Sequence, residues 1–393
     1  MSPIEVKIVH QYELEDVAAL FSELEQHYPD DELSTNYFLS SQWFINWLRS
    51  IEQRPLLLCC YSTAKSVETA HHTASHKLTQ NKQQLVGFAF WGRKTQLVGD
   101  SYYLNQSGDH LSDQVWIEHN DAICVNKLRD KVIEAMCHKL SKRKRFHRIV
   151  VHNALSEHWH YADLTVDITK EDSQFVSLGN NNYLDQLSKN TRAAVKRSNK
   201  LLEHTFGPIS VRSLQHDMSP SQAIPCIEKL KYLHKERWGS SEFGSGFNNP
   251  AFTAFHDNMF EAGKGFDILE VTAGSTLLAY LYIMIQKQDA LFYLSALESF
   301  DLGNKCKPGL SAHYAAIEYL NAAGYARYDF LAGRARYKEQ MSTHHYPVYH
   351  VQAERKTWLI SFARSIKKTY ILLKKKLYLR AEKTSDTSSQ GQH

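Results

Sequence analysis

The segment of residues 328–338, which reads YDFLAGRARYK, combines an apolar strand with groups that can do chemistry. It begins like a buried strand that contains Asp329, breaks at Gly333, and then presents two arginines, Tyr337 and Lys338. A carboxylate, a phenol and an ammonium group can exchange protons with a substrate or bind an anion. The pattern leaves two interpretations open: an edge strand that turns back to solvent, and a strand that delivers polar groups into a substrate cleft.

A second group of interest lies upstream, where an apolar strand leads through residues 298–309 into a helix. Backbone N–H groups in the first turn of a helix lack intrahelical partners and the helix dipole is positive there, so such a junction can bind an anion. Lys305 and Lys307 add charge, Pro308 fixes φ, and Gly309 lets the backbone come close to a ligand. The same residues fit an ordinary strand–loop–helix connection, because a lone glycine loop is a weak motif.

Two further groups could contact a substrate. A helix expected over 184–204 carries basic residues three to four positions apart, which therefore share one face: Lys189, Arg192, Lys196 and Lys200. This stripe fits a solvated face or a lid over a phosphate-bearing acceptor. Arg237 and Trp238 precede a glycine-rich segment, where the tryptophan fits either stacking on a sugar ring or packing in a core.

The elements that would position these residues follow a regular order in the second half of the chain. After a short strand over 210–214, hydrophobic periodicity predicts a helix pair, an antiparallel meander, a crossover helix and a last strand, over 223–238, 250–263, 266–273, 276–286, 290–297, 310–323 and 328–331. The tight turns inside the meander are the reason to expect antiparallel pairing.

The first half follows the same order loosely, without a repeat at the level of residues. Helices are expected over 14–24 and 40–48 and within 120–140, and strands over 55–61, 85–91 and 148–152. The polar tract 64–84 fits a long insertion in a hairpin, and residues 169–182, rich in Asp, Ser, Gly and Asn, predict a linker. The fold class is therefore α/β (α+β), with domains at 1–170 and 171–354 and a tail at 355–393.

Composition narrows the class of protein. A chain of 393 residues with 43% hydrophobic and 22% charged residues suits two globular domains of a soluble protein. No run of about eighteen apolar residues occurs, which excludes a spanning helix, and the first residues predict no secretory signal. Six scattered cysteines without CxxC spacing favour reduced thiols in a cytosolic protein. The histidine pairs lack a helical arrangement with a carboxylate, so no metal site is expected.

The C-terminal region is strongly basic, although the whole chain has a net charge of only +4. Residues 355–380 contain nine Lys or Arg and no acid, and apolar residues recur on one helical face of this segment. A basic amphipathic helix favours peripheral contact with the inner face of a membrane. A helix that packs back onto the second domain fits the same pattern.

The order strand, loop, helix, strand resembles the GNAT acetyltransferase superfamily, and most closely its branch associated with cellulose and exopolysaccharide biosynthesis. That branch is similar to the Fem-type aminoacyltransferases in having tandem GNAT-like halves. The resemblance covers most of residues 35–350 and is carried by 183–192, 233–238, 307–310, 328–333 with 337–338, and Ser41-Gln-Trp43 with Trp47. The classical Arg/Gln-x-x-Gly-x-Gly/Ala signature is degenerate here, with Lys305 and Gly309 as loose counterparts, which leaves another acyl-CoA or an aminoacyl-tRNA open as donor.

The resemblance implies a bacterial N-acyltransferase that uses acetyl-CoA or another acyl-CoA, without a metal. Its acceptor would be an amino sugar or a lipid-linked or nucleotide-linked envelope precursor. The strand 291–297 would polarise the thioester carbonyl through a backbone N–H. The cofactor would be held by Leu297, Lys305, Lys307, Gly309, Leu310 and Ser311.

The resemblance also suggests roles in proton transfer, whereas the acceptor-binding roles come from the basic and aromatic residues themselves. Asp329 or Glu298 would accept the proton of the amine, and Tyr337 would return a proton to the leaving thiolate. The acceptor would be bound by Arg192, Lys196, Arg237, Trp238 and Lys338. The first half shows no Lys/Gly loop at a helix start, which favours a structural or acceptor-binding role for it.

Two other functions remain open at this point. One is a transferase that depends on aminoacyl-tRNA, in which the basic helix and the tail bind tRNA. The other is a non-catalytic accessory module whose degenerate loop no longer binds the cofactor.

Overall fold

The computed structural model describes residues 4–63, 83–159, 161, 163–179, 182–241 and 244–356. The expected insertion over 64–84 and the basic helix over 355–380 therefore lie almost wholly outside the described residues. Below, the first half means the described residues up to 179 and the second half those from 182 onward.

The first half is a sheet segment with three helices on its surface. Its elements are β1 (Ile4–Val9), α1 (Leu14–His27), α2 (Ser41–Ser50), β2 (Leu56–Thr63), β3 (Gln83–Gln96), β4 (Gly99–Leu104), β5 (Ile123–Cys124), α3 (Arg129–Ser141), β6 (Phe146–Ala154) and β7 (Leu164–Ser177). Ser40 caps α2 by accepting a hydrogen bond from the Trp43 amide, and the helix buries Trp43, Phe44 and Trp47. Phe44 and Trp47 pack on Phe90 of the first half, whereas the Trp43 ring meets Phe255 of the second half with centroids 4.8 Å apart, so the helix joins the two halves.

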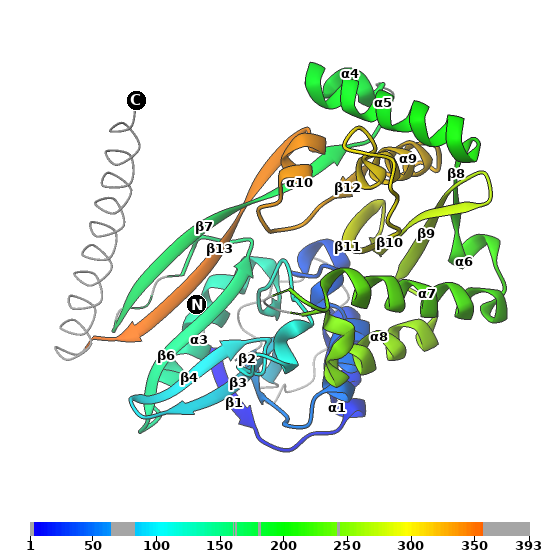
Figure 1. The fold of residues 1–393 in the computed structure, drawn as a ribbon. Coiled ribbons are helices and arrows are strands. Elements are labelled where there is room, and N and C mark those ends of the chain that lie inside the picture. The colour runs from blue at the N-terminus through cyan, green and yellow to red at the C-terminus, as the bar shows by residue number, and fades with distance from the viewer. Residues whose placement is uncertain are drawn as a thin grey trace, which may run out of the picture.

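The second half repeats this layout with additional helices. Its elements are α4 (Tyr183–Gln186), α5 (Lys189–Phe206), β8 (Ile209–Ser213), α6 (Leu214–Asp217), α7 (Pro220–Trp238), α8 (Pro250–Ala262), β9 (Phe266–Ala273), β10 (Thr276–Gln286), β11 (Asp289–Leu297), α9 (Pro308–Ala322), β12 (Arg327–Asp329), α10 (Arg336–Met341) and β13 (His344–Arg355). The side chains of α5 and α9 pack on one face of its sheet, and those of α7 and α8 pack on the other. In Figure 1, α4 and α5 lie across the top of the molecule above α9.

One sheet runs through both halves because the halves exchange their last strands. Its order over the described strands is β1-β2-β3-β4-β6-β13-β7-β12-β11-β10-β9-β8, with β5 paired to β3. The first-half strand β7 lies beside the second-half strand β12, and the second-half strand β13 lies beside β6. β7 and β13 pair with each other along their length and form the long ribbon on the left of Figure 1. Most neighbours are antiparallel, and the parallel pairs are β4–β6 and β11–β12.

The expected fold class is confirmed, and so is the antiparallel meander of β9, β10 and β11. The linker predicted over 169–182 is wrong, because residues 164–177 form β7. This strand reads as a linker because much of it is exposed, and its place in the sheet depends on backbone pairing with the distant β13. The predicted helix 184–204 is broken at Leu187, after which Ser188 caps α5.

No helix in the described part of the chain is long and apolar enough to span a membrane.

Candidate active site

The parallel strands β11 and β12 diverge, which opens the second half of the sheet. Their pairing covers only Asp289–Leu291 with Arg327–Asp329, while β11 continues to Leu297. The chain leaves β12 through Leu331, with φ of 59°, and Gly333, with φ of 103°. A left-handed backbone at Leu331 is unfavourable for a branched side chain, so the surrounding packing must hold this turn in place.

A cavity of about 360 Å³ lies at this divergence, and we call it the inter-half cavity. β11 contributes Phe292 and Tyr293 to its wall, the turn after β12 contributes residues 330–333, and α10 contributes Lys338. The other side comes from the first half and from β13: Trp116, Glu118, Asn153, Glu171 and His350. The cavity therefore exists only because the two halves face each other.

Glu118 is the buried carboxylate of the inter-half cavity. Its side chain is largely inaccessible, and its Oε2 has no hydrogen-bond partner among the described residues. Burial raises the pKa of Glu118 to about 8, although the ammonium group of Lys338 opposes this shift. Burial also lowers the pKa of Lys338, whose Nζ donates a hydrogen bond to the carbonyl of Ala332. A carboxylate with a pKa near neutrality can accept a proton from an amine.

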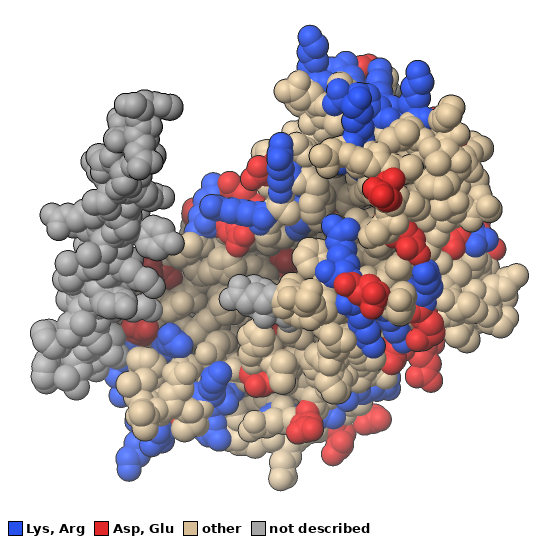
Figure 2. Space-filling model, in the orientation of Figure 1, with Lys and Arg blue, Asp and Glu red and all other residues tan. Residues whose placement is uncertain are grey.

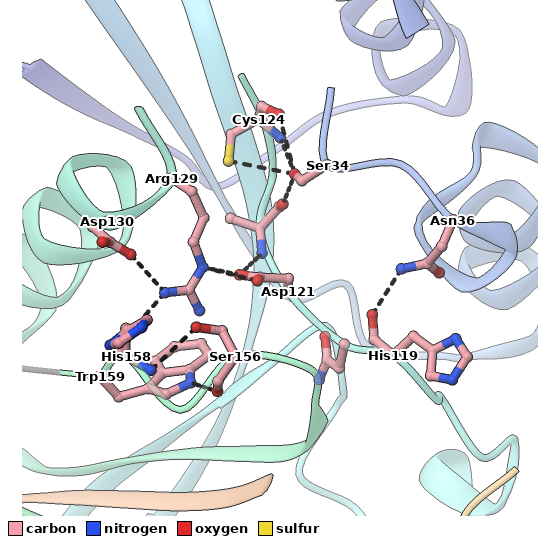
Figure 3. Close-up of polar contacts among 12 residues, drawn as sticks. Ser34, Asn36, His119, Asp121, Cys124, Arg129, Asp130, Ser156, His158 and Trp159 are labelled. Atoms are coloured by element: carbon pink, nitrogen blue, oxygen red, sulfur yellow. Dashed lines mark hydrogen bonds and ion pairs between the residues drawn. The ribbon is translucent and has the colours of Figure 1, made fainter. Parts of the chain in front are cut away.

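The residues that directly follow Glu118 are fixed by hydrogen bonds to neighbouring segments, as Figure 3 shows. Asn36 Nδ2 donates to the carbonyl of His119 at 2.8 Å. Arg129 Nε donates to Asp121 Oδ2 at 2.8 Å, and its guanidinium lies 4.6 Å from the centre of the Trp159 ring. Ser34 Oγ donates to the carbonyl of Ala122 at 2.6 Å. These contacts hold Glu118 at a defined position without touching its carboxylate.

The same segment closes the corresponding place in the first half, between β4 and β6. The Asn120 amide donates to the carbonyl of Asn153 at 2.9 Å, and Asn120 Nδ2 donates to the carbonyl of Leu104 at 3.0 Å. Asn105 Nδ2 in turn donates to Asn120 Oδ1 at 3.0 Å. Asn120 thus bridges the diverging ends of the two strands, and the chain itself fills the space that stays open in the second half.

Asp329 is fully buried, so the interpretation of residues 328–331 as a strand that turns back to solvent is wrong. Its Oδ1 accepts hydrogen bonds from the Leu331 amide at 2.8 Å and from the Tyr346 hydroxyl at 3.2 Å. Burial raises the pKa of Asp329 to about 6. The carboxylate lines a second cavity of about 570 Å³, together with His119 and Arg327, rather than the inter-half cavity.

Tyr337 lies beside the inter-half cavity, behind two of its wall residues. Its ring stacks on His313 with centroids 5.1 Å apart, and it meets Phe292 and Phe330 edge-on. Burial raises the pKa of Tyr337 to about 12, and nearby Arg237 opposes the shift. The phenol therefore stays protonated at neutral pH and retains a proton to donate.

Glu298 is not brought to the inter-half cavity. Its carboxylate forms an ion pair with Lys229 Nζ of α7 at 2.7 Å, and it is partly exposed. Of the three residues expected to take part in proton transfer, Glu298 and Asp329 do not line the inter-half cavity. Tyr337 lies next to Lys338, which does line it.

The residues expected to hold a cofactor gather where the loop after β11 enters α9. Lys305 and Lys307 are exposed, and a Cβ on Gly309 would lie 3.3 Å from Leu297 Cδ1. The amides of Gly309 and Leu310 have no hydrogen-bond partner among the described residues. Ser311 is different, since its hydroxyl donates to Ser198 Oγ of α5 at 2.8 Å.

The residues expected to bind an acceptor are dispersed, apart from Lys338. Arg192 Nη1 pairs with Asp185 at 3.1 Å, and Lys196 is exposed on α5. Arg237 and Trp238 end α7 on the surface, with the guanidinium 5.5 Å from the indole ring. Neither pair lines the inter-half cavity.

Sequence reasoning missed the first-half residues of the cavity, above all Glu118. A signal was present, since residues 118–121 read EHND between the apolar Ile117 and Ala122. A run of titratable and amide side chains inside an apolar stretch indicates buried polar contacts. Within the described residues, no group of three or more His, Cys, Asp or Glu is arranged to hold a metal ion.

Comparison with known proteins gives a match for part of the chain. Residues 189–339 match the model of a family described as an acetyltransferase (GNAT) domain. No curated protein matches the chain.

Solved structures with a similar arrangement include FemX, with a TM-score of 0.46, 10% identity, and coverage of 88% of this chain and 96% of that one. A tandem GNAT protein from the clavulanic acid biosynthesis pathway has a TM-score of 0.43, 9% identity, and coverage of 90% and 99%. L-PGS from Bacillus licheniformis has a TM-score of 0.43, 11% identity, and coverage of 73% and 85%.

Proposed function

We propose that this protein is an N-acyltransferase that moves an acyl group from a thioester donor to an amine bound in the inter-half cavity. The observation that carries the proposal is the cavity at the divergence of β11 and β12, with the buried carboxylate of Glu118 in its wall. This divergence lies inside the stretch that matches the acetyltransferase (GNAT) domain model. Residues 171–354 would bind the donor, and residues 1–170 would supply the opposite wall for the acceptor.

The start of α9 fits a phosphate-bearing donor, with acetyl-CoA as the first choice and another acyl-CoA as the alternative. The amides of Gly309 and Leu310, which have no partner in the described part of the chain, lie at the positive end of the helix dipole. Lys305 and Lys307 add charge, and the missing Cβ of Gly309 leaves room beside Leu297. The donor would supply the thioester when bound. Ser311 would hold α9 against α5 rather than contact the donor, because its hydroxyl already donates a hydrogen bond to Ser198 Oγ.

Glu118 is the group we assign to proton removal from the amine. The amine nitrogen attacks the thioester carbon, its proton passes to Glu118, and the oxyanion is stabilised by a backbone N–H of β11. The carbon–sulfur bond then breaks, and Tyr337 gives its proton to the leaving thiolate. Asp329 would support this site from behind, since its charge contributes to the raised pKa of Glu118. Lys338 would position the turn after β12 through the carbonyl of Ala332.

For the acceptor we propose an amino sugar, free or as part of an envelope or exopolysaccharide precursor. The volume of about 360 Å³ is at the lower end of the usual range for ligand pockets, which suits a single sugar ring. Trp116 lines the cavity and is 59% exposed, so its indole face is available for stacking on such a ring. Arg237 and Trp238 would contact only a longer acceptor.

A second candidate function, transfer from an aminoacyl-tRNA, is favoured by the surface of α5. Lys196, Arg197 and Lys200 are exposed there, and Figure 2 shows Lys and Arg side chains gathered at this end of the molecule. Such a cluster attracts phosphate backbones in a strongly salt-dependent way. Aminoacyl-tRNA supplied in place of acetyl-CoA distinguishes the two donors in one assay.

The proposal is tested by following thiol release from acetyl-CoA with a panel of amino sugars. We expect turnover by the full chain, loss of turnover in Glu118→Gln, and normal turnover in Glu134→Gln, where an exposed glutamate of α3 is changed. Absence of both turnover and a thermal shift with acetyl-CoA or other acyl-CoA thioesters would refute the proposed function.

A further inference from the structure

The turn between β3 and β4 presents two apolar side chains to solvent. Leu97 is fully exposed and Val98 is 70% exposed. Single exposed apolar residues are common on protein surfaces, but two adjacent ones at the tip of a hairpin form a small apolar projection. We call residues 96–99 the hairpin tip. It lies at the opposite end of β4 from the segment that carries Glu118 and Asn120.

The hairpin tip is braced by the turn that joins α3 to β6. The Asp100 amide donates to the carbonyl of Arg145 at 2.6 Å, and Arg145 Nη2 donates to the carbonyl of Gln96 at 3.3 Å. The backbone of Gly99 has φ of 134°, and a Cβ there would lie 2.6 Å from the Arg145 carbonyl oxygen. Only glycine allows this close approach. The apolar residues are thus held outward by a defined contact.

Cationic side chains surround the hairpin tip. The bracing turn reads Lys142-Arg143-Lys144-Arg145, and Lys142, Lys144 and Arg145 are exposed. Arg93 and Lys94 on β3 are also exposed. Among the described residues, the acidic groups near these cations include the buried Asp100, 3.7 Å from Arg145 Nε, and Asp109, which is close enough to feel the charge of Lys94. Glu354 lies 4.0 Å from Arg148 Nη1 of β6. Figure 2 shows Lys and Arg side chains at this end of the first half, at the lower left.

The last described strand, β13, ends beside the basic turn that braces the hairpin tip. Arg355 Nη2, at the end of β13, donates to the carbonyl of Ser141 at 2.9 Å, directly before the basic turn. The sequence that follows, residues 357–380, contains seven Lys or Arg and no acid. The chain beyond β13 therefore starts from the basic end of the first half, and its sequence is itself basic.

We propose that the hairpin tip and its basic surroundings dock on an anionic lipid surface. Leu97 and Val98 would enter the interfacial region, and the lysines and arginines of 93–94 and 142–145 would contact lipid phosphates. A nucleic acid would use the cations but leave the apolar tip in water, so the combination favours a membrane. This inference rests on folded residues of the first half, does not depend on the proposed acyl transfer, and assigns a contact separate from residues 355–380.

Co-sedimentation of the full chain with vesicles tests this surface. We expect binding to vesicles of phosphatidylcholine with phosphatidylglycerol and weak binding to phosphatidylcholine alone. The double variant Leu97→Ser/Val98→Ser should bind about ten-fold more weakly, because the apolar contribution is lost. Leu111→Ser, which changes another apolar residue that is 57% exposed, should bind like the unaltered chain. Lys142→Gln and Lys144→Gln should each weaken binding by about five-fold.

A direct probe separates docking through the hairpin tip from docking through other basic segments. Leu97→Cys carrying an environment-sensitive dye should shift its emission to the blue when the anionic vesicles are added, whereas Leu111→Cys should not. Unchanged vesicle binding by Leu97→Ser/Val98→Ser would overturn the proposal and assign any binding to the remaining basic segments. So would a preference for RNA over vesicles that the apolar substitutions leave intact.

Discussion

The parallel strand pairs β4–β6 and β11–β12 occupy the same position in the two halves, yet they end differently. In the first half, Asn120 bridges the diverging strands through the carbonyls of Leu104 and Asn153. In the second half, no part of the described chain closes the corresponding divergence, and a cavity of about 360 Å³ lies there. The segment that fills the first place also carries Glu118 to the second. The comparison teaches that the segment which closes the first half also places a buried carboxylate, the proposed base Glu118, in the wall of the cavity in the second half.

The largest effect is expected from Glu118→Gln, which removes the proposed base while keeping the shape of the side chain. Acyl transfer should fall by about 10²- to 10⁴-fold, the usual contribution of a general base. Because burial raises the pKa of Glu118 to about 8, the rate for the unaltered chain should rise with pH up to that region, as the carboxylate form accumulates. The variant should lose this rise. A variant that keeps both the rate and the pH dependence would remove Glu118 from the mechanism.

Asn120→Ala tests whether Asn120 closes the divergence of β4 and β6 in the first half. Its side chain is buried and bonds to Leu104 and Asn105, so the substitution removes this donor from the Leu104 carbonyl, while Asn105 Nδ2 keeps its hydrogen bond to the carbonyl of Asp121. The free energy of unfolding should fall by about 1–3 kcal/mol, the cost of one unsatisfied buried polar group. Urea denaturation measures this loss. Asn126→Ala is the matched control, since the Asn126 side chain makes an exposed contact with Asp31, and equal stability of the two variants would contradict the bridging role.

Tyr337→Phe removes a hydroxyl and keeps the ring that stacks on His313. Stability should therefore change little, while acyl transfer should fall by about 10- to 100-fold because the leaving thiolate loses its proton donor. Steady-state rates and a thermal melt distinguish these effects. An unaltered rate would show that solvent protonates the thiolate.

Gly309→Ala should have the smallest effect on acyl transfer, and this effect should be confined to the second half, where the strand divergence is open. The added Cβ would lie 3.3 Å from Leu297 Cδ1, which crowds the proposed donor position without reaching Glu118. We expect KM for the acyl donor to rise by roughly five-fold and KM for the amine to stay unchanged. The reason is that the crowding should weaken donor binding by less than about 1 kcal/mol. A rise in KM for the amine instead would place the acceptor at the start of α9.

Much of the fold was predictable from local patterns, and the parts that failed depend on distant contacts. The meander β9–β11 and the helix α9 follow from hydrophobic periodicity and turn residues. Residues 169–182 were predicted as a linker because many of them are polar and face solvent, and pairing with the distant strands β13 and β12 makes residues 164–177 the strand β7. No local pattern encodes that pairing.

The candidate site likewise contains residues that a local motif predicts and residues whose positions depend on distant contacts. Tyr337 and Lys338 could be picked from a short motif, and the structure places both at or beside the cavity. For Glu118 the run EHND indicates only buried polar contacts, and its place in the cavity wall could not be predicted because its environment is created by residues 330–338 of the other half. Asp329 and Glu298 were expected to act as bases on the strength of the family resemblance. Their directions are set by Tyr346 and Lys229, which are distant in sequence.

The central claim, that one of two equivalent strand pairs is open to a donor, is tested most directly by the stoichiometry of donor binding. Calorimetric titration of the full chain with a non-hydrolysable acetyl-CoA analogue should show one equivalent bound, with weaker binding in Gly309→Ala and unchanged binding in Asn126→Ala. Two equivalents would mean that the place filled by Asn120 also accepts the donor. No binding at all would contradict the assignment of the open pair to an acyl-CoA.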